Sequence, residues 1–250
     1  MLINGVKPLE INNNLVYTFD SAEVLSTAAA SFIATRCQDY ASIMEKVSLA
    51  LSGGSTPTKI YQQFIHSPLL EAMPWSSLEF YFGDERYVAH DDEQSNYKMA
   101  MSSFLATAPI SEQQVYAIPT YCDDAKVCAD KYSEIMKSQL GQKLVLDFAL
   151  LGMGDDGHTA SLFPATEVLS ETEKPAAAVY VEKFNSWRIS MTYPMFNRAK
   201  TVCILVAGEA KAKVLAEVLN NPAAGYPIQG IRNPNGMIWL VDRAATTQLT

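Results

Sequence analysis

The chain has 250 residues, of which 48% are hydrophobic and 18% charged, a balance typical of a globular protein with a sizeable core. Its formal net charge of −8 disfavours a nucleic-acid partner, which needs a basic surface. No apolar run reaches the length of a membrane span, and the N-terminus lacks the features of a signal peptide. We therefore expect one domain over residues 1–250, cytoplasmic, without a membrane partner, and acting as a monomer or small homo-oligomer.

Apolar runs of strand length alternate with segments of helical periodicity along the chain. Strands are predicted at residues 47–51, 78–82, 147–151, 178–181, 188–192, 201–206 and 237–241. Helices are predicted at residues 21–40, 58–64, 125–140 and 211–219. This alternation predicts βαβ units and an α/β fold, with a mostly parallel sheet covered on both faces.

The four cysteines do not indicate a metal site. Their spacing matches no zinc signature, and the gap between Cys122 and Cys128 is too long for a CxxC motif. We expect all four, including Cys37 and Cys203, to be reduced thiols.

The turn after the first predicted strand is rich in glycine and hydroxyl groups, with Gly53, Gly54, Ser55 and Thr56 in succession. Glycines let the backbone approach an anion closely, and the N-terminus of the following helix offers unpaired N–H groups. The segment has neither the lysine and spacing of a P-loop nor the GxGxxG pattern. The alternative is a tight strand-to-helix turn with a Ser or Thr cap, and the turn alone does not decide between the two.

The second predicted strand is followed by Asp84, Glu85 and Arg86. The planar guanidinium of Arg86 suits a phosphate or carboxylate ligand, and either acid could orient it or a catalytic group. The alternative for each charge is an ion pair within the protein.

The turn after the third predicted strand contains Asp156 and His158. Because an imidazole titrates near neutral pH, His158 is a candidate general base, and Asp156 a candidate for fixing its tautomer. The alternative is a structural histidine, which is our interpretation of His66 and His90. No second histidine stands at ligand spacing, so we predict no bound metal.

The strand predicted at 201–206 ends near Gly208, and Lys211 opens the next helix. A lysine is mildly unfavourable at a helix N-terminus, so an anionic ligand would explain it, although a solvated surface lysine is the commoner case. All four turns follow strand ends, which share one edge in a parallel sheet. We therefore expect the four turns to line a single crevice.

Taken together, these segments resemble the 6-phosphogluconolactonase family. The resemblance follows the chain in order through LALSGGSTP at 49–57, FYFGDERYV at 80–88, SNYKMA at 95–100, LLGMGDDGHTASLFP at 150–164, RISMTYP at 188–194 and GEAKA at 208–212. It implies a NagB/RpiA-type fold, which is a three-layer sandwich around a modified Rossmann-like, mostly parallel sheet. It also implies hydrolysis of 6-phospho-D-glucono-1,5-lactone in the oxidative pentose phosphate pathway, with no organic cofactor and no catalytic metal.

Two other functions are considered. Glucosamine-6-phosphate deaminases share the fold. Their sequence is similar to MDEY at the position of Gly83 to Arg86, and they have a glutamate at the position of Phe163. A non-catalytic sugar-phosphate sensor is the second, and it is disfavoured by the acidic charge and by a length that leaves no room for a fused DNA-binding domain.

The resemblance suggests a division of roles for acyl transfer to water. His158 would act as the base and return the proton to the ring oxygen, with Asp156 or Asp84 orienting it. No GxSxG elbow is present, so no serine nucleophile is expected. The 6-phosphate would be bound by Gly53, Gly54, Ser55, Thr56 and Lys211. Arg86 would bind either the phosphate or the oxyanion, and Arg188 is a weaker candidate for the same pocket.

Overall fold

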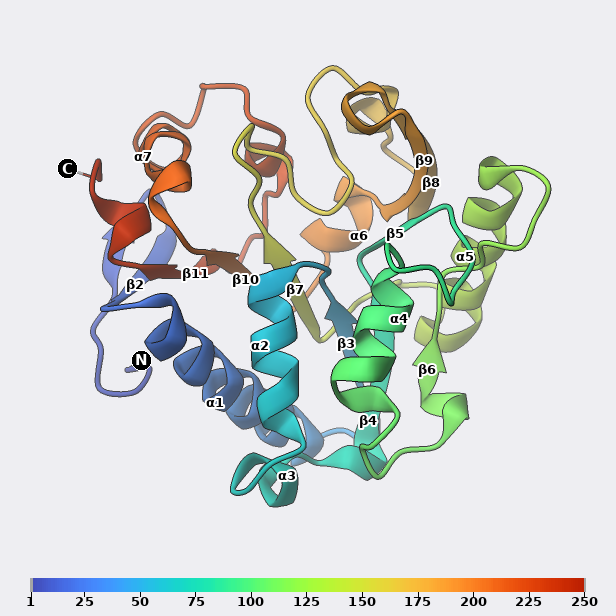
Figure 1. Cartoon of the computed structure of the whole chain (residues 1–250), viewed down its shortest axis with the longest axis horizontal. Helices are drawn as coiled ribbons and strands as arrows, with labels where there is room; N and C mark the ends of the chain where they lie inside the picture. The colour runs from blue at the N-terminus through green and yellow to red at the C-terminus, as the bar shows by residue number, and fades with distance from the viewer. Residues whose placement is uncertain (1, 250) are drawn as a thin grey trace.

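The computed structural model describes residues 2–249 and is organised around an eight-stranded sheet (Figure 1). All neighbouring strands are parallel except the antiparallel pair at one edge, β1–β2. The order across the sheet is β1 (Leu9–Ile11), β2 (Asn14–Phe19), β11 (Met237–Asp242), β10 (Thr201–Val206), β7 (Phe148–Gly152), β3 (Val47–Leu51), β4 (Leu78–Phe82) and β6 (Val115–Tyr116). The expected α/β class with a mostly parallel sheet is confirmed.

The central strands are those that the sequence predicts best. β3, β4 and β10 occupy the predicted ranges, and every residue in them is buried, as in strands covered on both faces. β7 lies one residue later than predicted. β2 was not predicted. Its buried residues are interspersed with partly buried ones, so no continuous apolar run marks the strand in the sequence.

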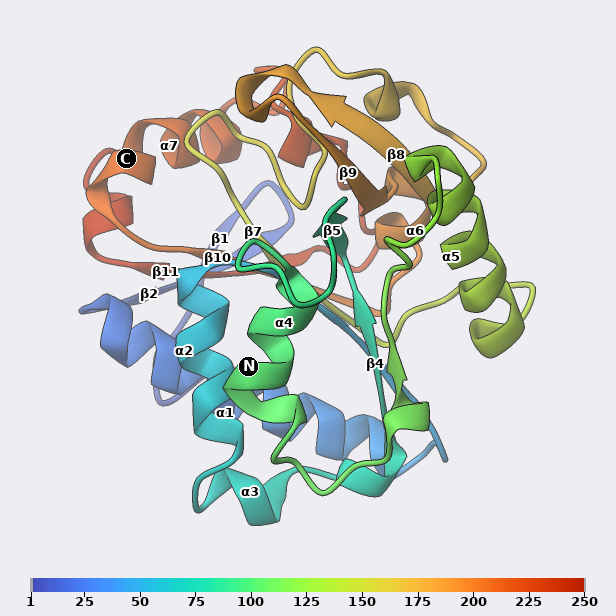
Figure 2. The same ribbon diagram turned by 45° about the vertical axis from the view of Figure 1, so that its right-hand side comes forward.

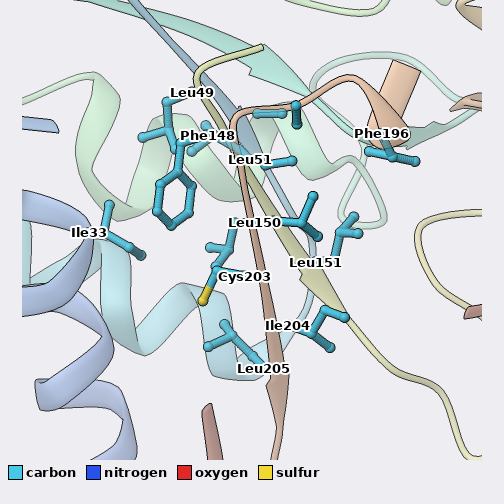
Figure 3. Packing of buried hydrophobic residues seen from close by; sticks show 14 of the residues in the cluster. Ile33, Leu49, Leu51, Phe148, Leu150, Leu151, Phe196, Cys203, Ile204 and Leu205 are labelled. Carbon is cyan, nitrogen blue, oxygen red and sulfur yellow. The ribbon is translucent and has the colours of Figure 1, made fainter. Parts of the chain in front are cut away.

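Helices cover both faces of the sheet. α1 (Ala22–Ala41) packs against α2 (Ser55–Phe64), β11 and β3 on one face. In Figure 3, Phe148 and Cys203 turn towards Ile33 of α1, whereas Leu151 and Ile204 turn to the opposite side, where Phe196 of α6 (Tyr193–Asn197) lies. The remaining helices are α3 (Leu69–Ala72), α4 (Asn96–Ala100), α5 (Ala125–Leu140) and α7 (Ala212–Asn220). Within residues 2–249, no helix combines the length and apolar character needed to cross a bilayer.

A second sheet of three antiparallel strands stands next to the first (Figure 2). Its order is β5 (Asp84–Arg86), β9 (Ser186–Met191) and β8 (Ala176–Val181), and α5 packs against β8 and β9. The Tyr132 hydroxyl of α5 accepts from the Phe82 N–H at 3.0 Å and donates to its carbonyl at 2.9 Å. These bonds hold the main chain at the end of β4, where it leaves one sheet and enters the other as β5.

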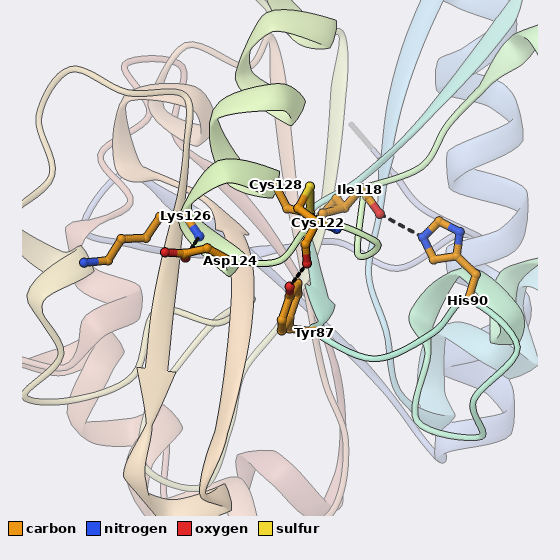
Figure 4. The surroundings of a disulfide bond; sticks show 7 residues. All are labelled: Tyr87, His90, Ile118, Cys122, Asp124, Lys126 and Cys128. Atoms are coloured by element: carbon orange, nitrogen blue, oxygen red, sulfur yellow. Dashed lines mark hydrogen bonds between the residues drawn. A yellow bond between two sulfur atoms is a disulfide. The ribbon is translucent and has the colours of Figure 1, made fainter.

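The expectation of four reduced thiols is wrong for one pair, because Cys122 and Cys128 form a disulfide (Figure 4). The chain turns back into α5 between them, which brings their Cα atoms to 5.6 Å, within disulfide range. The Tyr87 hydroxyl donates to the Cys122 carbonyl oxygen. Cys37 and Cys203 are buried free thiols.

Candidate active site

A cavity of about 510 Å³ opens where the central parallel strands end. All four predicted turns contribute to it, with Gly53 and Gly54 after β3, Asp84 and Arg86 after β4, Gly154 and His158 after β7, and Lys211 after β10. Arg188 and Phe184 reach it from the second sheet. The predicted convergence of the four turns at one sheet edge is therefore found in the structure.

The loop after β7 folds back so that the His158 ring lies over Gly154. The Gly154 N–H donates to the His158 carbonyl oxygen at 2.8 Å. A Cβ atom on Gly154 would lie 2.0 Å from His158 Nδ1, closer than any side chain permits. Gly157 has a φ of 72° and closes the turn. The imidazole can therefore occupy this position only because residue 154 is a glycine.

His158 is held by Asp156, the first of the two carboxylates considered for that role. His158 Nδ1 lies 2.5 Å from Asp156 Oδ1, and the His158 N–H donates to the same oxygen at 3.2 Å. Burial raises the pKa of Asp156, but hydrogen bonds from His158, its charge and Lys183 outweigh burial and bring this pKa to about 2. An ionised carboxylate only accepts, so Nδ1 carries the ring proton and Nε2 is the basic nitrogen.

The second carboxylate, Asp84, is bonded elsewhere. Its Oδ2 accepts from the Ser161 hydroxyl at 2.6 Å, and its Oδ1 lies 3.4 Å from the Asn96 amide nitrogen. Asp84 is buried and lines the cavity without a hydrogen bond to the imidazole among the described residues.

The three charged residues of strand β5 do not share one environment. Alternate residues of a strand face opposite sides, so Asp84 and Arg86 reach the cavity while Glu85 points away. The Glu85 carboxylate accepts from the N–H groups of Asn96 and Tyr97, both at 2.7 Å, at the N-terminus of α4. Burial raises the pKa of Glu85, and these hydrogen bonds oppose the change. Glu85 therefore anchors a helix, and among the described residues it forms no ion pair with the Arg86 guanidinium, although it accepts the Arg86 backbone N–H at 2.8 Å.

Two arginines face each other across the β5–β9 ladder, with Arg86 directly opposite Arg188. Arg188 is only 8% exposed, and both guanidinium Nε atoms are buried without a hydrogen-bond partner. Burial lowers the pKa of Arg188, and the adjacent charge of Arg86 lowers it further. Two like charges placed together in this way would be stabilised by an anionic ligand.

Lys211 adds a third cation at the start of α7. Burial lowers the pKa of Lys211, whereas the charges of Asp155 and Asp156 favour its protonated form. No carboxylate within residues 2–249 forms an ion pair with Arg86, Arg188 or Lys211. The three cations of the cavity are therefore available to a ligand.

The turn after β3 presents backbone to the cavity. A Cβ atom on Gly53 would lie 2.1 Å from Asn96 Oδ1, and Gly54 has a φ of 107° and is the N-cap of α2 without a side-chain capping bond. Ser55 and Thr56 lie outside the cavity lining, in the first turn of α2. If Ser55 and Thr56 contribute to anion binding, they do so through the N-terminal turn of α2.

Sequence reasoning missed the aromatic residues next to the imidazole. The Phe163 ring stacks on His158 with centroids 3.9 Å apart and planes 22° apart. Phe184 packs edge-on against Phe163 at 5.7 Å, and the Arg188 guanidinium lies 5.0 Å from the Phe184 centroid. No periodicity distinguishes such residues from core aromatics. Within residues 2–249, no group of three or more His, Cys, Asp or Glu side chains is arranged to hold a metal ion.

Comparisons with known proteins identify the family and the fold. A family model described as Glucosamine-6-phosphate isomerases/6-phosphogluconolactonase matches residues 20–239. The chain is 37% identical over 211 residues to a 6-phosphogluconolactonase of Nostoc sp., a match that covers 82% of this chain and 85% of that protein. It is 33% identical over 233 residues to one of Synechocystis sp., covering 91% and 95%. A solved 6-phosphogluconolactonase from Trypanosoma cruzi matches with a TM-score of 0.85 and 29% identity, covering 97% of this chain and 99% of that one.

Proposed function

The chain belongs to the family of glucosamine-6-phosphate isomerases and 6-phosphogluconolactonases, and from this membership we propose how it works: it hydrolyses 6-phospho-D-glucono-1,5-lactone, with His158 as the base. Two relatives, at 37% and 33% identity, are named 6-phosphogluconolactonase, and the matches cover 85% and 95% of their lengths. The observation that carries the proposal is the cavity itself. It combines one imidazole, held through Nδ1 by Asp156, with three cations that have no carboxylate partner among the described residues.

Lactone hydrolysis is acyl transfer to water. Nε2 of His158 takes a proton from the attacking water as the oxygen adds to the lactone carbonyl, and Asp156 stabilises the imidazolium that results. The tetrahedral oxyanion then collapses, the bond to the ring oxygen breaks, and the imidazolium returns its proton to that oxygen. The product is 6-phosphogluconate, and His158 is neutral again.

The phosphate group of the proposed substrate accounts for the three cations that line the cavity. A phosphomonoester carries nearly two negative charges at neutral pH, which is the ligand that Arg86, Arg188 and Lys211 together would stabilise. The Gly53–Gly54 turn adds backbone N–H groups at the N-terminus of α2. Anchoring at C6 leaves the carbonyl at C1 to reach His158, so binding energy remote from the reacting carbon is used for orientation.

The site favours the lactonase over the deaminase. Phe163 occupies the position five residues after the histidine, where the resemblance places a glutamate in deaminases, and its ring is stacked on His158. A phenyl ring cannot exchange protons, so the ring-opening chemistry of a deaminase lacks that carboxylate here. The stack also shields one face of the imidazole from water.

We place the activity in the cytoplasm, because phosphorylated sugars stay in the compartment that makes them. The Cys122–Cys128 bond is then one of the rare disulfides of that compartment. We also propose that the protein acts as a monomer or small homo-oligomer.

A timed assay tests the function. Lactone is generated in situ, acid release is followed, and spontaneous hydrolysis is subtracted. We expect rapid turnover of the phosphorylated lactone, slow turnover of unphosphorylated gluconolactone, and no ammonia from glucosamine 6-phosphate. Ammonia release would favour the deaminase, and binding of 6-phosphogluconate without lactone turnover would favour a sensor.

A further inference from the structure

A lysine outside the predicted site, Lys183, touches the carboxylate that holds His158. It lies in the 3₁₀ turn Glu182–Phe184 at the tip of the β8–β9 hairpin. Its Nζ is 3.2 Å from Asp155 Oδ1 and 3.2 Å from Asp156 Oδ2. The hairpin of the second sheet is thereby tied to the loop after β7.

The two oxygens of Asp156 serve different partners. Oδ1 faces His158 Nδ1 at 2.5 Å, and Oδ2 accepts from Lys183. A carboxylate held at both oxygens cannot rotate about its χ2 angle, so the direction of its bond to the imidazole is fixed. Hydrogen bonds to Asp156 and then Asp155 raise the pKa of Lys183, so it stays charged at neutral pH.

The same hairpin tip also supports the ring that stacks on the imidazole. Phe184, next to Lys183, packs edge-on against Phe163, which stacks on His158. One short turn therefore supports both neighbours of the imidazole, its carboxylate and its stacking ring.

We propose that Lys183 is a positioning residue for His158, which fixes the Asp156 carboxylate and, through its positive charge, disfavours the imidazolium. This proposal rests on the proposed function of His158. The Asp156 carboxylate beside the imidazole stabilises the protonated ring, and the Lys183 ammonium group 3.2 Å from the other carboxylate oxygen offsets part of that effect. The other charged groups around His158 are Asp155 on its own loop, Lys211 at α7, and Asp84, Arg86 and Arg188 across the cavity.

NMR titration of the imidazole tests the proposal without using turnover. The chain has three histidines, so loss of one signal in His158→Ala assigns the His158 resonance. In Lys183→Met we expect the His158 midpoint to rise by roughly 0.5 pH units at low ionic strength, the size expected of one half-exposed charge nearby. His66 and His90 should not move, and Lys183→Arg should restore the wild-type midpoint.

Kinetics supply the second measurement. The acidic limb of kcat/KM should move upward by the same amount in Lys183→Met, with kcat reduced several-fold and KM nearly unchanged. Lys174→Met is a matched control, because it removes a lysine–aspartate pair of similar exposure. Lys174 lies 2.8 Å from Asp130, and neither residue lines the cavity. Lys174→Met should alter neither the midpoint nor the kinetics.

Two results would overturn the proposal. One is an unchanged His158 midpoint in Lys183→Met, even with reduced kcat, since this leaves Lys183 only a structural role. The other is an increase in KM alone, which assigns Lys183 to substrate binding. A shifted midpoint in a protein without lactonase activity would reject the proposed function but retain the coupling of Lys183 to His158.

Discussion

Arg188→Met should make the protein more stable and weaken phosphate binding at the proposed site. Arg188 stands directly opposite Arg86 and is nearly buried, without an ion-pair partner among the described residues. Two positive charges in close contact repel by about 1 kcal/mol when they are as well solvated as in bulk water, and by more near a protein surface, so we take about 1 kcal/mol as the lower limit. Methionine keeps much of the apolar stem of arginine, so removing the charge should relieve this repulsion with little loss of packing. For a chain of this length, about 1 kcal/mol corresponds to a rise in Tm of roughly 2–4 °C.

The same substitution, Arg188→Met, should weaken the binding of a phosphorylated ligand. A charge-assisted hydrogen bond contributes about 1.5–3 kcal/mol, so loss of the Arg188 contact should weaken phosphate binding by about 10- to 150-fold. Thermal unfolding with increasing 6-phosphogluconate measures both effects, since a ligand of the native state raises Tm according to its affinity. Arg243→Met, which removes an exposed arginine paired with Asp20, is the control and should leave the ligand response unchanged. A variant that is less stable without ligand, yet responds to 6-phosphogluconate like wild type, would refute the reasoning.

Three further changes test other parts of the account. Gly154→Ala forces a Cβ against the imidazole, so kcat should fall by about 10²-fold or more while the circular dichroism spectrum is retained; wild-type kcat would show that the loop adapts. Replacing Cys122 and Cys128 with serine opens a loop of six-residue separation and should lower the free energy of unfolding by about 2 kcal/mol, as measured in urea; unchanged stability would contradict it. Because the pKa of Asp156 is depressed to about 2, its contribution to stability is complete above the unfolded pKa of about 3.8 and is lost as pH falls towards 2. The unfolding free energies of Asp156→Asn and wild type should therefore converge as the pH approaches 2, and a constant difference would rule this out.

The central sheet was predictable because its strands are short, apolar and buried on both faces. β3, β4 and β10 needed no correction, and α5 occupies its predicted range, because periodicity and capping residues mark these elements locally. Their shared direction then places the following turns at one edge, which is why the amino-acid sequence was enough to group Gly53, His158 and Lys211.

The rest depends on contacts that no local pattern records. Arg188 was a predicted candidate for the pocket, but its position directly opposite Arg86 comes from pairing between β5 and β9, strands about 100 positions apart in sequence. Phe163 and Lys183 reach His158 and its carboxylate through tertiary packing of a loop and a hairpin tip. The disulfide was missed for another reason: the expected compartment decided the prediction, whereas the geometry of the turn before α5 decides the bond.

The central claim is that one imidazole acts as the base, and the kcat of His158→Ala on freshly generated phosphorylated lactone tests it most directly. With Tm and 6-phosphogluconate affinity close to wild type, we expect kcat to fall by about 10²- to 10⁴-fold after subtraction of spontaneous hydrolysis. A folded His158→Ala protein that turns over the lactone at nearly the wild-type rate would contradict the account.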